Sequence, residues 1–164
     1  MDCNYLKECG SCTLFTPYDE QILFKTDLVK QKFLEFYDGE FDVFSSTPKH
    51  YRTRAEFGIW HEGSKLCYTM HASEKGKKVF IDDCPKVCEQ ILDLMPMLLE
   101  NLQSDENLRT KLFGAEFISC KSGVLVTLLY HKRLDGEFEA AMKILASKLD
   151  VTILARSRGQ KLLS

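Results

Sequence analysis

Polar and apolar side chains alternate between residues 51 and 61. Ala55 and Phe57 fall on one side of this stretch, and Arg54 and Glu56 fall on the other. A period of two residues is typical of a strand with one buried face. Apolar runs between turn residues predict further strands at 41–44, 66–70, 78–81, 114–120, 124–131 and 151–155, with the start of another before residue 164.

Helical spacing of apolar residues predicts three longer helices and one short helix. Thr16 is expected to cap the first helix, with Pro17 in its first turn. Ser104 or Asp105 is expected to cap the short one. Pro96 lies inside the second helix and is expected to kink or break it, because proline lacks the N–H that an inner helical turn needs. The predicted helices span residues 16–37, 86–103, 105–112 and 136–149.

The order of these elements predicts an α+β fold, in which an antiparallel sheet built from hairpins carries packed helices. The 164 residues suffice for one ordinary domain. We divide the chain into a cysteine-rich loop segment at 1–15 and an α+β domain at 16–164. Because the pattern stops in the middle of a strand, we expect a fragment of a longer protein.

The composition is that of a globular protein, with 45% hydrophobic residues and a net charge of −2. This balance does not indicate a nucleic-acid binder, so any such function would need a local basic patch. No apolar run reaches the ~18 residues of a membrane-spanning helix, and the N-terminus lacks the apolar core of a signal peptide. We therefore expect a cytoplasmic protein with reduced cysteines and no membrane partner.

Four of the seven cysteines form a pattern typical of a metal site. Cys3, Cys9 and Cys12 are closely spaced, and Cys84 stands far downstream before a proline. Such a triplet with a distant Cys-Pro partner favours an iron–sulfur cluster, whereas structural zinc more often uses two short-spaced pairs. Unrelated thiols near a chain end are the alternative. The remaining cysteines lie in apolar patterns and are expected in the core: Cys67, Cys88 and Cys120.

The strand at 51–61 also carries candidate phosphate ligands. Arg52 and Arg54 project from the face that carries Glu56. Arginine forks bind phosphate oxygens, although the pattern alone favours a solvated strand face with an Arg–Glu pair.

Two aromatic side chains and one histidine complete the candidate set. Trp60 and Phe113 could stack on an unstacked base, although a lone aromatic residue is more often part of the core. His131 ends a strongly apolar strand, and strand ends carry function more often than strand middles. The chain contains no P-loop, no dinucleotide-binding glycine motif and no His-Glu-x-x-His sequence, and no Ser-His-Asp arrangement is suggested.

Three separated blocks closely resemble the N-terminal domain of bacterial tRNA (uracil-5-)-methyltransferases. They are residues 50–61 (His-Tyr-Arg-Thr-Arg-Ala-Glu-Phe-Gly-Ile-Trp-His), residues 108–113 (Leu-Arg-Thr-Lys-Leu-Phe) and residues 126–135 (Val-Thr-Leu-Leu-Tyr-His-Lys-Arg-Leu-Asp). The resemblance runs from about Phe41 to the end of the chain. It implies RNA contacts in these blocks, at Arg52, Arg54, Glu56, Phe113 and His131.

The cysteines resemble a different branch of the same enzymes. Together with Gly10, the four-cysteine pattern is similar to the cluster motif of 23S rRNA uracil-5-methyltransferases, which hold a 4Fe–4S cluster beside their RNA-binding surface. Ser11 stands where that motif has a second glycine. The best-known tRNA enzymes lack these cysteines, so the chain combines two patterns. The blocks around Arg52 and His131 favour tRNA.

The resemblance also implies a reaction. In the family, a cysteine thiolate adds to C6 of a T-loop uracil flipped out of its stack. C5 then takes a methyl group from S-adenosylmethionine, and a glutamate removes the C5 proton. These groups belong to a C-terminal Rossmann-like domain whose Ser-Cys-Asn-Pro and Asp-Pro-Pro-Arg motifs do not occur here. Cys120 only mimics the first motif, so we expect no catalytic residue and an inactive fragment.

Three functions stay open at this point. The first is the RNA-recognition portion of a tRNA (uracil-5-)-methyltransferase, which binds the tRNA T-arm, does not bind DNA and works with a catalytic domain of the same polypeptide. The second is the matching portion of a 23S rRNA enzyme. The third is a small iron–sulfur or zinc interaction domain. An electron-transfer role fits less well, since ferredoxins are usually acidic and lack so large a mixed core.

Overall fold

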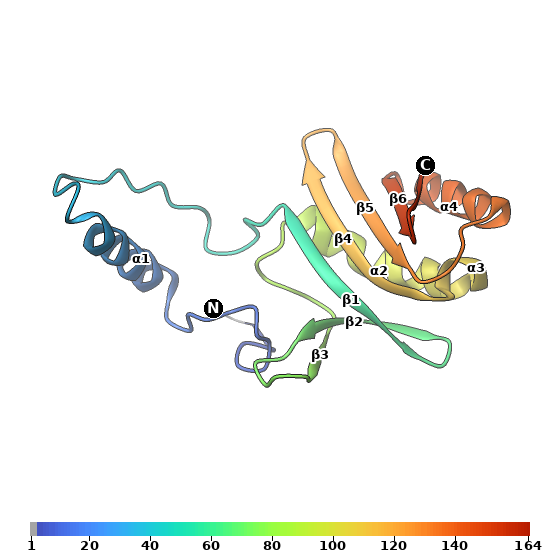
Figure 1. Cartoon of the computed structure of the whole chain (residues 1–164), viewed down its shortest axis with the longest axis horizontal. Helices are drawn as coiled ribbons and strands as arrows, with labels where there is room; N and C mark the ends of the chain where they lie inside the picture. The colour runs from blue at the N-terminus through green and yellow to red at the C-terminus, as the bar shows by residue number, and fades with distance from the viewer. Residues whose placement is uncertain (1–2) are drawn as a thin grey trace.

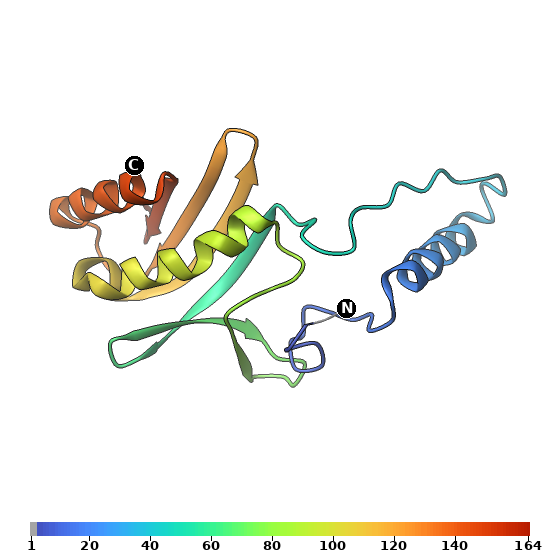
Figure 2. The same cartoon turned by 180° about the vertical axis from the view of Figure 1, so that it is seen from behind.

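The structure, a computed structural model that describes residues 3–164, is built on one seven-stranded sheet. Its elements are α1 (Tyr18–Phe33), β1 (Arg54–Glu62), β2 (Lys65–His71), β3 (Lys78–Ile81), α2 (Glu89–Ser104), α3 (Glu106–Arg109), β4 (Leu112–Cys120), β5 (Gly123–Tyr130), α4 (Gly136–Leu149), β6 (Thr152–Ser157) and β7 (Gln160–Leu163). The strands lie in the order β3-β2-β1-β4-β5-β6-β7. Helices α2, α3 and α4 cover one face and leave the other open (Figures 1 and 2).

The predicted two-sided strand is confirmed at β1. Ala55 and Phe57 are buried beneath the helices, whereas Arg54 and Glu56 are exposed on the open face. The core continues into α2, whose Leu98 is fully buried. The open face is therefore where side chains of this sheet are free to meet a ligand.

The α+β class is confirmed, and the sheet is mostly antiparallel, as expected, except at one pair of strands. β5 and β6 pair in parallel, while every other pair of neighbouring strands is antiparallel. The reason is the connection between them: α4 carries the chain back along the sheet, so β6 starts at the same end as β5. Asp135 starts this crossover helix, since its side chain accepts a hydrogen bond from the N–H of Phe138 at 2.9 Å.

The expected break at Pro96 does not occur. α2 runs without interruption through this residue. The missing N–H removes one backbone hydrogen bond, but Met95 and Leu98 on either side are fully buried against the sheet. Packing of this apolar face keeps the helix continuous. The cap predicted for the short helix is confirmed at Asp105, whose carboxylate accepts from the N–H of Asn107 at 2.8 Å.

The first helix differs from its prediction at both ends. α1 begins after Pro17, without a side-chain cap from Thr16, and ends at Phe33 instead of residue 37. The carbonyl of Phe33 accepts from the N–H groups of Phe36 and Tyr37 at 2.8 and 2.7 Å, which closes a turn there. No strand forms at the expected 41–44 stretch.

Residues 13–49, which include α1, form an arm that stands away from the sheet (Figures 1 and 2). Both of its ends are attached to the body. The N–H of Gly10 donates to the carbonyl of His71 at 2.9 Å, and the N–H of Arg52 donates to the carbonyl of Lys86 at 2.8 Å. No helix in the described part of the chain is both long and apolar enough to cross a bilayer.

Candidate nucleic-acid interface

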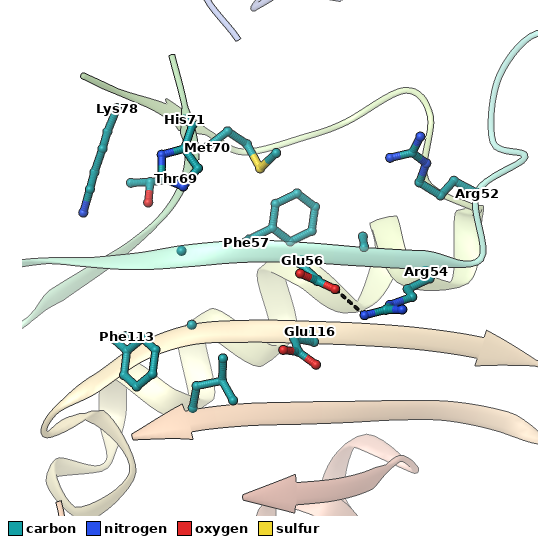
Figure 3. A pocket seen from close by; sticks show the side chains of 14 residues that line it. Arg52, Arg54, Glu56, Phe57, Thr69, Met70, His71, Lys78, Phe113 and Glu116 are labelled. Atoms are coloured by element: carbon teal, nitrogen blue, oxygen red, sulfur yellow. Dashed lines mark hydrogen bonds and ion pairs between the residues drawn. The ribbon is translucent and has the colours of Figure 1, made fainter. Parts of the chain in front are cut away.

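A shallow depression of about 860 Å³ lies on the open face of the sheet, over β1, β2 and β4. Figure 3 shows the side chains that line it. Four of the five predicted RNA contacts are among them: Arg52, Arg54, Glu56 and Phe113. The alternation along β1 aims Arg54 and Glu56 at this face, and the antiparallel pairing of β1 with β4 adds Glu116 directly opposite Glu56.

Arg54 and Glu56 form an ion pair across one face of β1. Their side chains are 65% and 56% exposed, so the pair is well solvated and adds little to stability. The predicted Arg–Glu pair therefore exists, and Glu116 places a second carboxylate beside it (Figure 3). Arg52 differs, because its guanidinium has no ion-pair partner within residues 3–164.

Phe113 and His131 stack on one another at the edge of the depression. Their ring centroids lie 3.9 Å apart and their planes differ by 11°. A register shift between Leu112 and Gly114 re-aims the side chain of Phe113, and the N–H of His131 donates to the carbonyl of Lys111 at 2.9 Å. The structure thus brings together two residues that the sequence predicted separately.

A second depression, of about 660 Å³, adjoins the first and shares Phe113 with it. Trp60 and Phe113 are 44% and 40% exposed, so neither is a core residue. The Lys78 ammonium lies 4.5 Å from the centroid of the Trp60 ring. Arg109 and Lys111 also line this hollow, with His131.

The cations of the second depression are functional candidates that the sequence reasoning missed. Arg109 and Lys111 were part of the block at 108–113, but no pattern distinguished them from ordinary surface charges. Lys78 pairs with His71 across β2 and β3, and only the structure shows that its side chain reaches the Trp60 ring. Together with Phe113, these residues form a surface that can contact both bases and phosphates.

Lys132 belongs to the same strand end but turns away from this surface. Its ammonium donates to the carbonyl of Asn107 and lies 4.9 Å from the centroid of the Phe138 ring. Burial lowers the pKa of Lys132, while Asp135 and Asp105 act in the opposite direction. Lys132 is therefore a structural residue that fastens the end of β5 to α3.

The four predicted metal ligands line one small cavity of about 60 Å³ beside the arm. Cys3, Cys9 and Cys12 come from the N-terminal loop, and Cys84 comes from the segment between β3 and α2. Burial is the main cause that raises the pKa of the Cys3 thiol, and the neighbouring Cys84 and Cys12 raise it further. Asp83, which lines the same cavity, has a buried Oδ1 atom without a hydrogen-bond partner.

These observations test whether the residues fit a metal centre. The donor set fits, because the side chains of four cysteines line one cavity and thiolates are the ligands of iron–sulfur clusters and of structural zinc. The spacing is not that of a finished site: across residues 3–164, no group of three or more His, Cys, Asp or Glu side chains is already arranged to hold a metal ion. The thiols would have to close by side-chain rotation.

The expectation that the other three cysteines are core residues holds in part for Cys88, which packs against the core, and is wrong for Cys120. Cys120 is exposed, and Cys67 and Cys88 are only partly buried. Cys120 is the last residue of β4 and points to the open face, where no helix covers it. The sulfur of Cys120 forms hydrogen bonds with the Ser122 hydroxyl and with backbone groups of Ser122 and Gly123. These hydrogen bonds lower the pKa of the Cys120 thiol.

Comparisons with known proteins find one enzyme family. A family profile described as tRNA (Uracil-5-)-methyltransferase matches residues 17–164. A protein of Campylobacter concisus named tRNA/tmRNA (uracil-C(5))-methyltransferase is 85% identical over all 164 residues, which make up 45% of its own length. Proteins with the same name are 54% identical in Campylobacter curvus, over 100% of this chain and 44% of theirs, and 42% identical in Acinetobacter baylyi, over 89% and 42%. The chain thus spans less than half the length of these relatives.

Proposed function

The chain belongs to the tRNA (uracil-5-)-methyltransferase family, and from that premise we propose that it is the tRNA-recognition portion of such an enzyme. In the full-length protein this portion would bind the T-arm, while the C-terminal part would make 5-methyluridine in the T-loop. S-adenosylmethionine would supply the methyl group there. The substrate is inferred from the names of the relatives and from the surface described above.

The observation that carries this proposal is the Phe113–His131 stack, at 3.9 Å between ring centroids. This stacked pair lies where β4 begins and β5 ends, and it offers an aromatic plane to an unstacked base. Stacking on aromatic side chains is how proteins most often read single-stranded RNA loops. Cations lie on both sides of this plane, with Arg52 and Arg54 in one depression and Lys111 in the other.

The residues of this portion would act by binding and orienting, not by chemistry. Arg52 would engage a phosphate, since its guanidinium has no ion-pair partner within residues 3–164. Arg54 is held by Glu56 and would have to exchange this carboxylate for a phosphate oxygen, so a small electrostatic penalty accompanies its contact. Glu56 and Glu116 repel phosphate and would leave the centre of the depression to a base or a sugar hydroxyl.

We further propose that residues 1–15 bind a metal centre through Cys3, Cys9, Cys12 and Cys84. A 4Fe–4S cluster is the first choice, and zinc is the alternative. The support is that all four cysteines, from two segments far apart in the sequence, line one cavity. Such a centre would tie the N-terminal loop to the segment before α2 and would not take part in methyl transfer.

The proposal is tested by titrating the chain with a fluorescent T-arm stem-loop at several salt concentrations. We expect saturable binding that weakens with salt, because counterions are released from the phosphates. Arg52→Gln should weaken binding and reduce the salt slope by about 1, as expected for one lost phosphate contact. Lys148→Gln, on α4 and away from the open face, is the matched control and should bind normally.

An equal-length hairpin of 23S rRNA distinguishes the second candidate function. If it binds more tightly than the T-arm, the rRNA alternative is correct. If neither hairpin binds above the level of an unrelated RNA, the RNA-recognition proposal is wrong. A small interaction domain would then be the better description of the chain.

A further inference from the structure

The arm at residues 13–49 carries many large apolar side chains that are exposed to solvent. On α1, Leu23, Phe24 and Leu28 are exposed. In the segment that follows, the side chains of Phe36 and Phe44 are 81% and 93% exposed. Contiguous apolar patches of this kind mark interaction surfaces. The views from both sides show that neither the sheet nor helices α2–α4 cover the arm (Figures 1 and 2).

The arm folds on itself, but only partly. The ring of Phe41 contacts those of Phe33 and Tyr37, with centroid distances of 6.1 and 5.1 Å. The hydroxyl of Tyr18 donates to the carbonyl of Ser46 at 2.8 Å. These contacts fold the returning segment against α1 and leave the opposite side of the helix open. The arm is therefore a formed unit with one unpartnered apolar side.

The helix of the arm depends on further packing for its stability. It has 16 residues and no side-chain hydrogen bond at its N-cap. Isolated helices of about this length are marginal in water, and packing of an apolar face provides most of the stability of helices in proteins. A cover for Leu23, Phe24 and Leu28 would supply what α1 lacks.

The charge of the arm argues that its cover is protein and not RNA. Between Tyr18 and Phe44 the sequence has seven acidic and three basic residues, a net charge of −4. This net charge repels a phosphate backbone. The basic residues of the candidate interface lie on the sheet instead.

We propose that the unpartnered side of the arm docks on the C-terminal part of the full-length polypeptide. The chain makes up only 45% of the relative that it matches at 85% identity, so more than half of that relative's length is available to cover the arm. A covalently attached partner also has a high effective concentration, which favours it over a second copy. The inference rests on the proposed function only in taking that C-terminal part to be present in the same polypeptide.

Hydrogen exchange tests this inference without RNA. Two chains are compared: the 164-residue chain, and a full-length chain in which the relatives' C-terminal part follows Ser164. We expect peptides from α1 and residues 34–44 to exchange at least about tenfold more slowly in the full-length chain. Leu28→Glu in that chain should restore fast exchange. Lys25→Gln should not, because Lys25 is exposed and lies about 120° around the helix from the centre of this apolar side.

A different result for hydrogen exchange is expected if something other than the C-terminal part covers the arm. Equal exchange of the arm in both chains would overturn the inference. Protection that rises with protein concentration would indicate a second copy, and protection that requires added tRNA would indicate RNA, so both also overturn it. Peptides from residues 112–130 report whether each variant still folds. Because no RNA is needed, failure here leaves the T-arm titration as a separate test.

Discussion

Phe113 reaches the surface because the pairing of β4 with β5 is irregular at that point. The register shifts between Leu112 and Gly114, and a bulge of this kind commonly re-aims a side chain next to a functional site. His131 follows the end of β5 and stacks on Phe113. The aromatic plane therefore depends on two residues whose backbones are fixed by the same strand pair.

Replacing Phe113 by alanine should weaken binding of the T-arm stem-loop by about 1–3 kcal/mol, the range found for loss of base stacking. Ile118→Ala is the matched control, because Ile118 is also an exposed apolar residue of β4 but lies outside both depressions. The measurement is a titration at one fixed salt concentration. Equal loss in both variants would remove Phe113 from the interface.

For single residues, the sequence predicted which side chains belong to the candidate site better than it predicted how they contact one another. Arg54 and Glu56 were paired correctly, because strand alternation sets both on one face. Phe113 and His131 were each selected by resemblance, but their contact depends on a bulge that leaves no clear sequence signal. Cys120 was misplaced in the core, since an apolar pattern does not say which face of a sheet the helices cover.

Helix α2 packs its apolar face against the side of the sheet opposite the open face. Its buried residues are Ile91, Leu94, Met95, Leu98 and Leu102. This regular spacing made the helix predictable and also explains why Pro96 does not break it. The direction of β6 was not predictable in the same way, because periodicity identifies strands and not their neighbours.

Truncation of Leu98 should show how much the packing of α2 contributes. Leu98 is fully buried and Met97 is exposed, so Leu98→Ala should lower the free energy of unfolding by about 2–5 kcal/mol. Met97→Ala should change it by no more than about 0.5 kcal/mol. Urea denaturation of both variants gives the comparison. A similar small change in both would mean that α2 is not part of the cooperative core.

Considered as a whole, the molecule has a packed α+β body and an arm whose two ends meet beside one cysteine-lined cavity. Four cysteines, which the sequence predicts as metal ligands from their spacing, line one cavity, and a metal centre there stays a proposal. The arm itself could not be predicted, because the apolar residues of α1 recur at the same spacing as those of a helix in the core. Only the three-dimensional arrangement reveals that its apolar side has no cover within residues 3–164.

Metal binding at the cavity should stiffen the base of the arm. Anaerobic incubation with iron and sulfide should give a brown protein with about four irons per chain, the content of one cluster. Cys84→Ser should abolish this, whereas Cys120→Ser, which changes an exposed thiol outside the cavity, should not. Loaded protein should show slower hydrogen exchange at residues 3–12 and 82–88 than the apoprotein, while residues 112–130 stay unchanged.

The same loading experiment decides between iron and zinc, and the metal affinity that it measures should depend on pH. Colourless protein with stoichiometric zinc would replace the cluster by a zinc site, and absence of both metals would contradict a metal centre.

Thiols must lose their protons to bind either metal. Because burial raises the pKa of Cys3 above its ordinary value, the apparent zinc affinity should increase as the pH rises and decrease as it falls. If affinity is unchanged across this range, or equal in Cys84→Ser and Cys120→Ser, the zinc is bound elsewhere, and contacts such as the backbone hydrogen bonds at Gly10 and Arg52 hold the arm without a metal.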